Sequence, residues 1–195
     1  MYKPFAALVL AAIFTLAATA QTIETNIVFN NSNAAIDNRY IVYSPNQKLA
    51  LDNFEGKPDA YSDAVAITSS GFLFKAGFRS KAGKATLDIQ VECSFDKQLS
   101  WMKERGKTNY VLGHEQHHFD ISYISTLLFI KKLKQTRFTT GQYREQLQDV
   151  YNNAINDMQQ LQNKYDEETK NGQLKDKQEE SSKKIAEQIA SLVEG

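Results

Sequence analysis

All three histidines of the 195-residue chain fall within one segment, His114-Glu115-Gln116-His117-His118. Residues four positions apart on an α-helix share a face, so His114 and His118 can direct their imidazole rings at one metal ion. Zinc binds neutral imidazoles, and a catalytic zinc site keeps one coordination position open for water. Glu115, about 100° around the helix from His114, can reach that water as its general base. This H-E-x-x-H spacing predicts a zinc site with His114 and His118 as ligands and Glu115 as the catalytic residue.

The third protein ligand of such a site has to come from elsewhere, because no well-placed histidine is left to supply it. We expect a carboxylate from a second helix, antiparallel to the motif helix because the connection between them is short. Glu168 continues the apolar stripe of that helix and should face inward, where a carboxylate needs a partner or a metal ion. Glu168 is therefore the preferred third ligand, although a surface carboxylate at the helix end is an equally good interpretation. Asp166, Asp157 and Asp120 are the next candidates for this ligand.

Other polar residues near the motif are expected to do different work. His117 points away from the His114–His118 face and is expected at the surface or in contact with a ligand. Asp120, two residues beyond His118, points to another face of the helix, which favours a role in holding nearby structure or in contacting a ligand over direct binding of the metal. Tyr165 can donate a hydrogen bond to an oxyanion, but a tyrosine on an apolar stripe is more typical of a core. The competing interpretation of the whole motif is a polar helix turn without a metal.

Residues 23–95 have the periodicity of β-strands. Within residues 85–95, apolar and polar residues alternate, and this period of two indicates a strand with one buried face. A strand-like stretch at residues 65–78 precedes it, and residues 81–84 predict a hairpin turn between the two. Shorter strands are expected at residues 25–29 and 40–43.

After residue 95 the periodicity changes to that of helices. Residues 98–104 predict one or two helical turns. Thr108 is the expected N-cap of a long helix that runs to about Gln135 and carries the histidines. A second helix follows, with Asn171-Gly172 as its stop signal. The sequence therefore predicts an α+β fold, an N-terminal antiparallel β-rich part followed by a helical hairpin carrying HExxH, which is the order of elements in zincins.

The two ends of the chain differ from this domain. Residues 1–20 combine a positive charge, a short apolar run and small residues at the end, which predicts a signal peptide and a secreted or periplasmic protein. The run is shorter than the roughly 20 residues that span a bilayer, so no permanent membrane span is expected. Residues 21–172 form the predicted domain. Residues 173–195 form a polar C-terminal tail, in which Ile185, Ile189 and Leu192 favour one weakly amphipathic helix.

Composition restricts the partners. The formal net charge is zero, so the chain has no basic excess that would favour a nucleic-acid partner. Cys93 is the only cysteine and is expected as a buried strand residue, because it cannot form an internal disulfide. Stability must then come from the core and from a metal ion. No feature of the sequence specifies an oligomeric state.

The block at residues 114–121, HEQHHFDI, resembles a secreted bacterial family of predicted zinc-dependent proteases, a domain of unknown function with an HEQ-x-HFD-I hallmark. Residues 49–58 are similar to the L-x-W-x-D-F-x-G-x-P segment of that family, with Leu51 in place of Trp and Asn53 in place of Asp. Ser100-Trp101 and residues 165–169 also match, so the resemblance covers roughly residues 40–172. It implies a zincin-like fold, a zinc-dependent peptidase, and Glu168 at the position of a family glutamate.

Two positions depart from the family pattern. Asn171 stands where the family has a histidine before glycine, and His117 stands where it usually has glycine. If that family histidine assists catalysis or metal binding, the present chain is a weaker or inactive member.

Three functions are consistent with these features. The leading one is a zinc-dependent peptidase that hydrolyses peptide or protein substrates with zinc-activated water, with the strand at residues 85–95 as the edge that binds an extended peptide. The alternative is a catalytically inactive zincin-fold protein of the envelope that binds metal or peptide, which Asn171 favours. The third is a structural helical envelope protein whose polar tail binds a partner.

Overall fold

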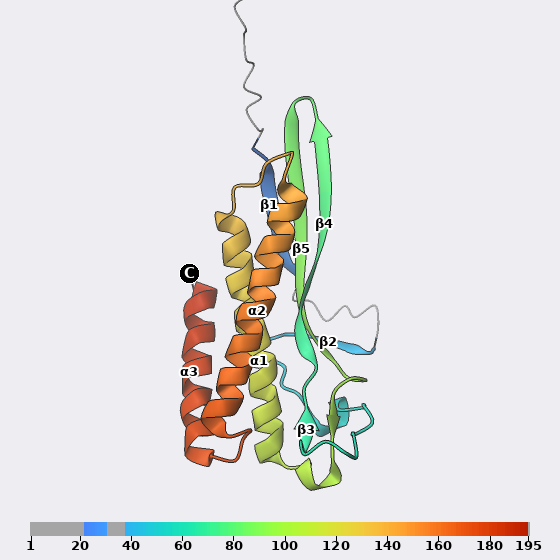
Figure 1. Cartoon of the computed structure of the whole chain (residues 1–195), viewed down its shortest axis with the longest axis vertical. Helices are drawn as coiled ribbons and strands as arrows, with labels where there is room; N and C mark the ends of the chain where they lie inside the picture. The colour runs from blue at the N-terminus through green and yellow to red at the C-terminus, as the bar shows by residue number, and fades with distance from the viewer. Residues whose placement is uncertain (1–21, 31–37, 195) are drawn as a thin grey trace, which may run out of the picture.

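The computed structural model describes residues 22–30 and 38–194, and in this part the chain is a mixed α+β protein (Figure 1). The signal peptide predicted at residues 1–20 lies outside the described residues. The helices are α1 (Asn109–Gln135), α2 (Tyr143–Thr169) and α3 (Lys175–Glu194). The strands are β1 (Glu24–Asn30), β2 (Tyr40–Val42), β3 (Ala66–Ile67), β4 (Ser70–Lys81), β5 (Lys84–Asp96) and β6 (Trp101–Met102), with short 3-10 turns at Leu51–Asn53 and Glu104–Gly106.

Strand β5 is the centre of the main sheet. The predicted hairpin is present: β4 runs antiparallel along the whole of β5, from Ser70 opposite Phe95 to Lys81 opposite Lys84. The other edge of β5 pairs first with β1 and then with β2. Both edges are therefore occupied, and the expectation that residues 85–95 form an open edge for a peptide is wrong.

The β-rich part is not wholly antiparallel, because β1 pairs with β5 in the parallel direction. Alternating apolar residues predict where a strand lies and which face is buried, but they carry no information on strand direction. Direction follows from the connection, and β1 is joined to β5 through β2, β3 and β4 and not through a hairpin.

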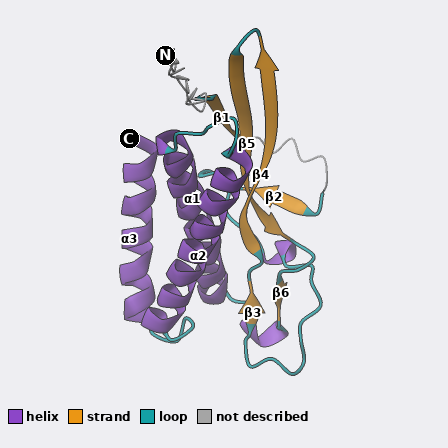
Figure 2. Cartoon of the chain, turned by 45° about the horizontal axis from the view of Figure 1, so that its top comes forward, coloured by secondary structure: helices purple, strands orange, loops and turns teal. Residues whose placement is uncertain are grey.

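One face of the sheet is buried under the helices, as Figure 2 shows. The inward side chains of β5 are at most 1% exposed and include the predicted core residue Cys93; they are Leu87, Ile89, Val91, Cys93 and Phe95. The first three pack with Phe129 and Leu133 of α1, which are also fully buried. Cys93 and Phe95 pack with Phe119 and Tyr123 of the same helix. Burial of this apolar surface fixes α1 against the sheet.

The helical hairpin has the predicted bounds to within a few residues. Thr108 is the N-cap of α1, since its hydroxyl accepts a hydrogen bond from the Val111 amide at 3.2 Å. Helix α2 returns beside α1 and ends at Thr169. The next three residues, Lys170, Asn171 and Gly172, all have positive φ. The helical turns predicted at residues 98–104 are wrong: Trp101 and Met102 form strand β6, which pairs with β3. That pairing depends on residues far away in the sequence, which local periodicity does not contain.

The polar C-terminal segment is part of the helical layer. Helix α3 packs beside α1 and α2, and its Ile185 is buried with Ile121, Ile124 and Tyr165. The helix is longer than the short amphipathic stretch that the sequence indicates. None of the helices in residues 22–30 and 38–194 has both the length and the apolar character needed to cross a membrane.

The docking of α3 can be tested at Ile185. Ile185→Ala removes a side chain that is 8% exposed, and we expect the free energy of unfolding to fall by about 2 to 4 kcal/mol in urea denaturation. Val193, which is 59% exposed on the same helix, is the control, and Val193→Ala should change it by less than about 0.5 kcal/mol. Equal effects of the two substitutions would contradict a docked helix.

Candidate metal centre

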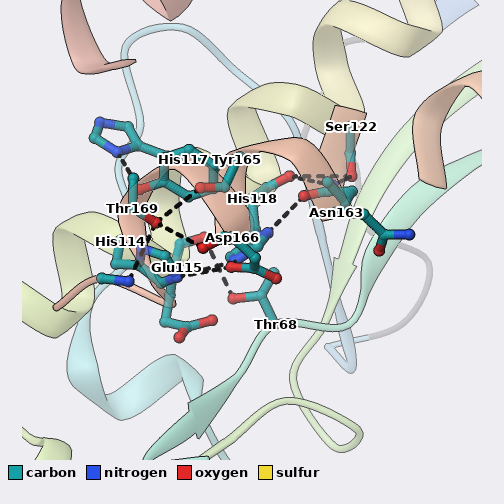
Figure 3. A network of polar contacts seen from close by, with 12 residues as sticks. Thr68, His114, Glu115, His117, His118, Ser122, Asn163, Tyr165, Asp166 and Thr169 are labelled. Carbon is teal, nitrogen blue, oxygen red and sulfur yellow. Dashed lines mark hydrogen bonds and ion pairs between the residues drawn. The ribbon is translucent and has the colours of Figure 1, made fainter. Parts of the chain in front are cut away.

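Three potential ligand atoms meet between α1 and α2 (Figure 3). His114 Nε2 lies 3.2 Å from Asp166 Oδ1, His118 Nε2 lies 3.1 Å from the same oxygen, and the two nitrogens are 3.2 Å apart. A tetrahedral zinc ion with bonds of about 2.0 Å places its ligand atoms about 3.3 Å from one another. The three atoms therefore have the separation of three corners of a zinc tetrahedron, and a fourth corner is left for water or substrate.

The third member of this group is Asp166 and not Glu168. Glu168 is exposed and pairs with Lys164 at 3.8 Å, one helical turn away. Two residues apart on a helix are separated by about 160° around its axis, so Asp166 and Glu168 cannot face the same helix. The buried face of α2 contains Tyr165 and Thr169, and Asp166 lies beside it.

The two remaining candidate carboxylates also lie outside the group. Asp157 is exposed on α2. The carboxylate of Asp120 is buried and accepts hydrogen bonds from Tyr43 and Gln116. Glu168, the ligand preferred from the sequence, therefore lies outside the group, and Asp166, the next candidate, lies beside His114 and His118, whose side chains meet as the H-E-x-x-H spacing predicts.

The orientation of His118 is fixed by a glutamine of α2. Gln162 Nε2 donates to the backbone oxygen of His118 at 2.8 Å and to Ser122 Oγ at 3.2 Å, so its amide oxygen faces the imidazole. That oxygen lies 2.5 Å from His118 Nδ1, which must therefore carry the proton. In the neutral ring His118 Nε2 then has the electron pair that metal binding requires, and without a metal ion a proton on this nitrogen makes the hydrogen bond to Asp166.

The ionisation of the group shows that it favours a positive charge. Burial raises the pKa of Asp166, but the hydrogen bonds of His114 and His118 outweigh it and hold that pKa well below its usual value. Burial lowers the pKa of His118, whereas Asp166 raises it, and the net direction is upward. A divalent cation among the three atoms would satisfy the same electrostatic demand more strongly than a proton.

Tyr165 packs against all three histidines. Its ring stacks on His114 at a centroid distance of 4.8 Å and meets His117 and His118 edge-on. Burial raises the pKa of Tyr165 and lowers that of His117 to about 4, so both are neutral, and the phenol oxygen and His117 Nδ1 share a hydrogen bond of 2.9 Å. Tyr165 is thus a packing residue whose hydroxyl is already bound, and His117 is its hydrogen-bond partner and not a surface residue.

The motif residues Gln116 and Asp120 hold a loop on the far side of α1. Asp120 Oδ1 accepts from Tyr43 Oη and from Gln116 Nε2, both at 2.8 Å. Gln116 Oε1 in turn accepts from the backbone amide of Leu49 at 2.8 Å. The predicted structural role of Asp120 agrees with these contacts, which fix residues 43–49 to the face of α1 opposite the metal group.

An open cleft of about 560 Å³ gives access to the group. One wall is the segment at residues 63–68, which contains strand β3, and the other is the α2 face that contains Gln159, Asn163 and Asp166. Glu115, predicted as the general base, is 4% exposed and lines this cleft together with His114 and His118. Its backbone oxygen accepts from Thr68 Oγ1 at 3.3 Å, which ties the segment at residues 63–68 to α1.

The loop after α2 closes one end of the cleft. Asn171 and Gly172 line it, and Tyr110 Oη donates to the Gly172 backbone oxygen at 2.7 Å. Gly172 has a φ of +74°, and a Cβ at this position would lie 3.1 Å from ring atoms of His114. Glycine is therefore required here both for the left-handed backbone and for the approach of the loop to a ligand.

Comparison with known proteins adds no assignment, because no family model, no curated protein and no solved structure matches the chain. Sequence reasoning missed the role of Gln162. A signal was available: Gln162 and Asp166 are four residues apart on the second helix and mirror the spacing of His114 and His118 on the first. Two polar pairs of the same spacing on antiparallel helices can face one another.

Zinc binding distinguishes Asp166 from Glu168 as the carboxylate ligand from α2. Asp166→Asn removes a charged ligand and should weaken zinc binding by more than about 100-fold in a chelator competition, which exceeds the usual loss from an outer contact. Glu168→Gln is the matched control and should bind zinc as the wild type does. A loss in Glu168→Gln with none in Asp166→Asn would contradict the ligand set.

Gly172→Ala should also weaken zinc binding, by about tenfold, because the added Cβ forces the His114 ring out of place. The left-handed backbone costs an alanine a further ~1 kcal/mol. Gly141→Ala is the control, since a Cβ there meets nothing within 4 Å. Wild-type zinc affinity in Gly172→Ala would show that the ring has room to move.

Proposed function

We propose that the chain is a zinc-dependent peptidase of zincin-like architecture that hydrolyses internal peptide bonds. The observation that carries the proposal is the convergence of His114 Nε2, His118 Nε2 and Asp166 Oδ1 at zinc spacing beside Glu115 in an open cleft. A bound zinc ion would lower the pKa of its water towards about 7 and polarise the scissile carbonyl. The residues would supply the rest of the chemistry.

Glu115 is the proton carrier in this mechanism. Its carboxylate takes a proton as the water oxygen bonds to the carbonyl carbon, and it delivers that proton to the leaving nitrogen as the C–N bond breaks. One water is consumed, and a carboxylic acid and an amine are formed. Gln162 keeps His118 in the tautomer that leaves Nε2 free, and the Asp166 carboxylate supplies the negative charge that balances the cation.

The walls of the cleft favour an extended peptide as substrate. The segment at residues 63–68 lies along the cleft, and its β3 portion pairs with β6. An extended backbone of this kind can pair with a peptide on its remaining edge. None of the described residues that line the cleft is lysine or arginine, so no fixed cation is present there to bind a terminal carboxylate. This supports cleavage inside a chain over removal of C-terminal residues.

The second candidate is a protein that binds metal or peptide without cleaving it. Asn171 favours it, because this residue lines the cleft at a position where the resembled family has a histidine. An amide cannot exchange protons at neutral pH, so any acid–base step that depends on that histidine would be lost. Under either function, the signal peptide expected at residues 1–20 predicts a secreted or periplasmic location.

Glu115→Gln separates the two functions. The substitution leaves the three ligand atoms unchanged, so zinc content should stay at about one ion per chain. Cleavage of a peptide library should fall by about 100- to 10,000-fold, which is the usual contribution of a general base. Activity that survives the substitution would contradict the mechanism. A wild type that holds zinc and peptide without cleavage would favour the second candidate.

A further inference from the structure

Gln178 is buried although the helix around it is polar. It lies in the first turn of α3 and is 6% exposed. Its Nε2 donates to the backbone oxygen of Tyr110 at 3.2 Å, and this bond fixes which end of the amide carries the oxygen. The opposite end, Oε1, is buried without a hydrogen-bond donor. A buried amide oxygen in this state costs free energy until it is paired.

A second unpaired polar atom lies beside it. His114 Nδ1 is also buried without a partner. Both atoms border the space next to Gly172, where a Cβ would lie 3.1 Å from His114 Nδ1 and 3.3 Å from Gln178 Oε1. Gln178 Oε1 needs a hydrogen-bond donor, and His114 Nδ1 becomes a donor once His114 Nε2 binds a metal. The two atoms are therefore chemically complementary.

The neighbouring ligand already has this arrangement. His118 Nδ1 meets the amide oxygen of Gln162, whose Nε2 is held by a backbone oxygen of α1. Gln178 shares one half of this pattern, since its Nε2 donates to the backbone oxygen of Tyr110, which is also in α1. The other half, a bond from His114 Nδ1 to Gln178 Oε1, is not made in the structure, where both atoms are unpaired. Metal-binding histidines almost always donate their second N–H to such an oxygen, which fixes the tautomer and the orientation of the ring.

We propose that Gln178 is the positioning residue of His114: its amide oxygen accepts the Nδ1 proton and so directs Nε2 towards the metal. The inference rests on the proposed metal site and extends it to α3, since each histidine ligand is then oriented by a glutamine from a different helix. The C-terminal helix becomes a component of the active centre, and its docking is coupled to metal affinity.

Two substitutions test the bond. Gln178→Leu and Gln178→Glu both lose the donor to Tyr110, but only glutamate keeps an oxygen that can accept from His114. We expect zinc binding, measured by chelator competition, to weaken about 10- to 100-fold in Gln178→Leu and to return to wild-type strength or better in Gln178→Glu. Gln188→Leu, at an exposed glutamine of α3, is the control and should bind zinc normally.

A direct readout is the ¹⁵N chemical shift of His114 Nδ1, recorded with and without zinc. It should change in Gln178→Leu, stay near the wild-type value in Gln178→Glu, and be unaffected by Gln188→Leu. Equal losses of affinity in the leucine and glutamate variants would assign the role to the Tyr110 contact and overturn the proposal, as would an unchanged shift in Gln178→Leu. If the wild type binds zinc but cleaves no peptide, the peptidase function fails while the Gln178 substitutions still decide this inference; if it binds no zinc, the inference fails together with the metal site.

Discussion

Three electron-pair donors lie about 3.2 Å apart between α1 and α2, and such a group is stable only when a cation or a proton lies among them. Two imidazole nitrogens and a carboxylate oxygen would otherwise repel one another in surroundings of low polarity. The rest of the structure is organised around this demand. His118 is held from behind by Gln162 and His114 by the ring of Tyr165, so the two imidazoles do not relieve the repulsion by turning away.

The two faces of α1 have different roles. One face is fixed by the sheet and by the polar contacts of Asp120 and Gln116, which tie the loop at residues 43–49 to the helix. The other face presents His114 and His118 to α2. Because α1 is held rigidly on its structural face, the positions of the histidines are decided by the core and not by the metal, which is the preorganisation that a catalytic site needs.

Tyr165 connects the metal group to the core. It is buried against Ile121, Ile124 and Ile185, and its ring also covers the imidazole of His114. This contact excludes water from the side of the histidines that faces away from the cleft, which strengthens every electrostatic interaction within the group. The arrangement leaves the cleft as the accessible side, where Glu115 lies and where a substrate would enter.

The sequence by itself determined the local features. The i, i+4 spacing places His114 and His118 on one face of any helix, Thr108 starts that helix, and alternating residues predict β5 and its buried face. It did not determine which acid completes the site, because a choice between Asp166 and Glu168 depends on how α2 is rotated about its axis. That rotation is set by the packing of Tyr165 and its neighbours against two other helices. The parallel pairing of β1 and the burial of Gln178 were likewise decided by tertiary contacts between distant segments, which no local pattern encodes.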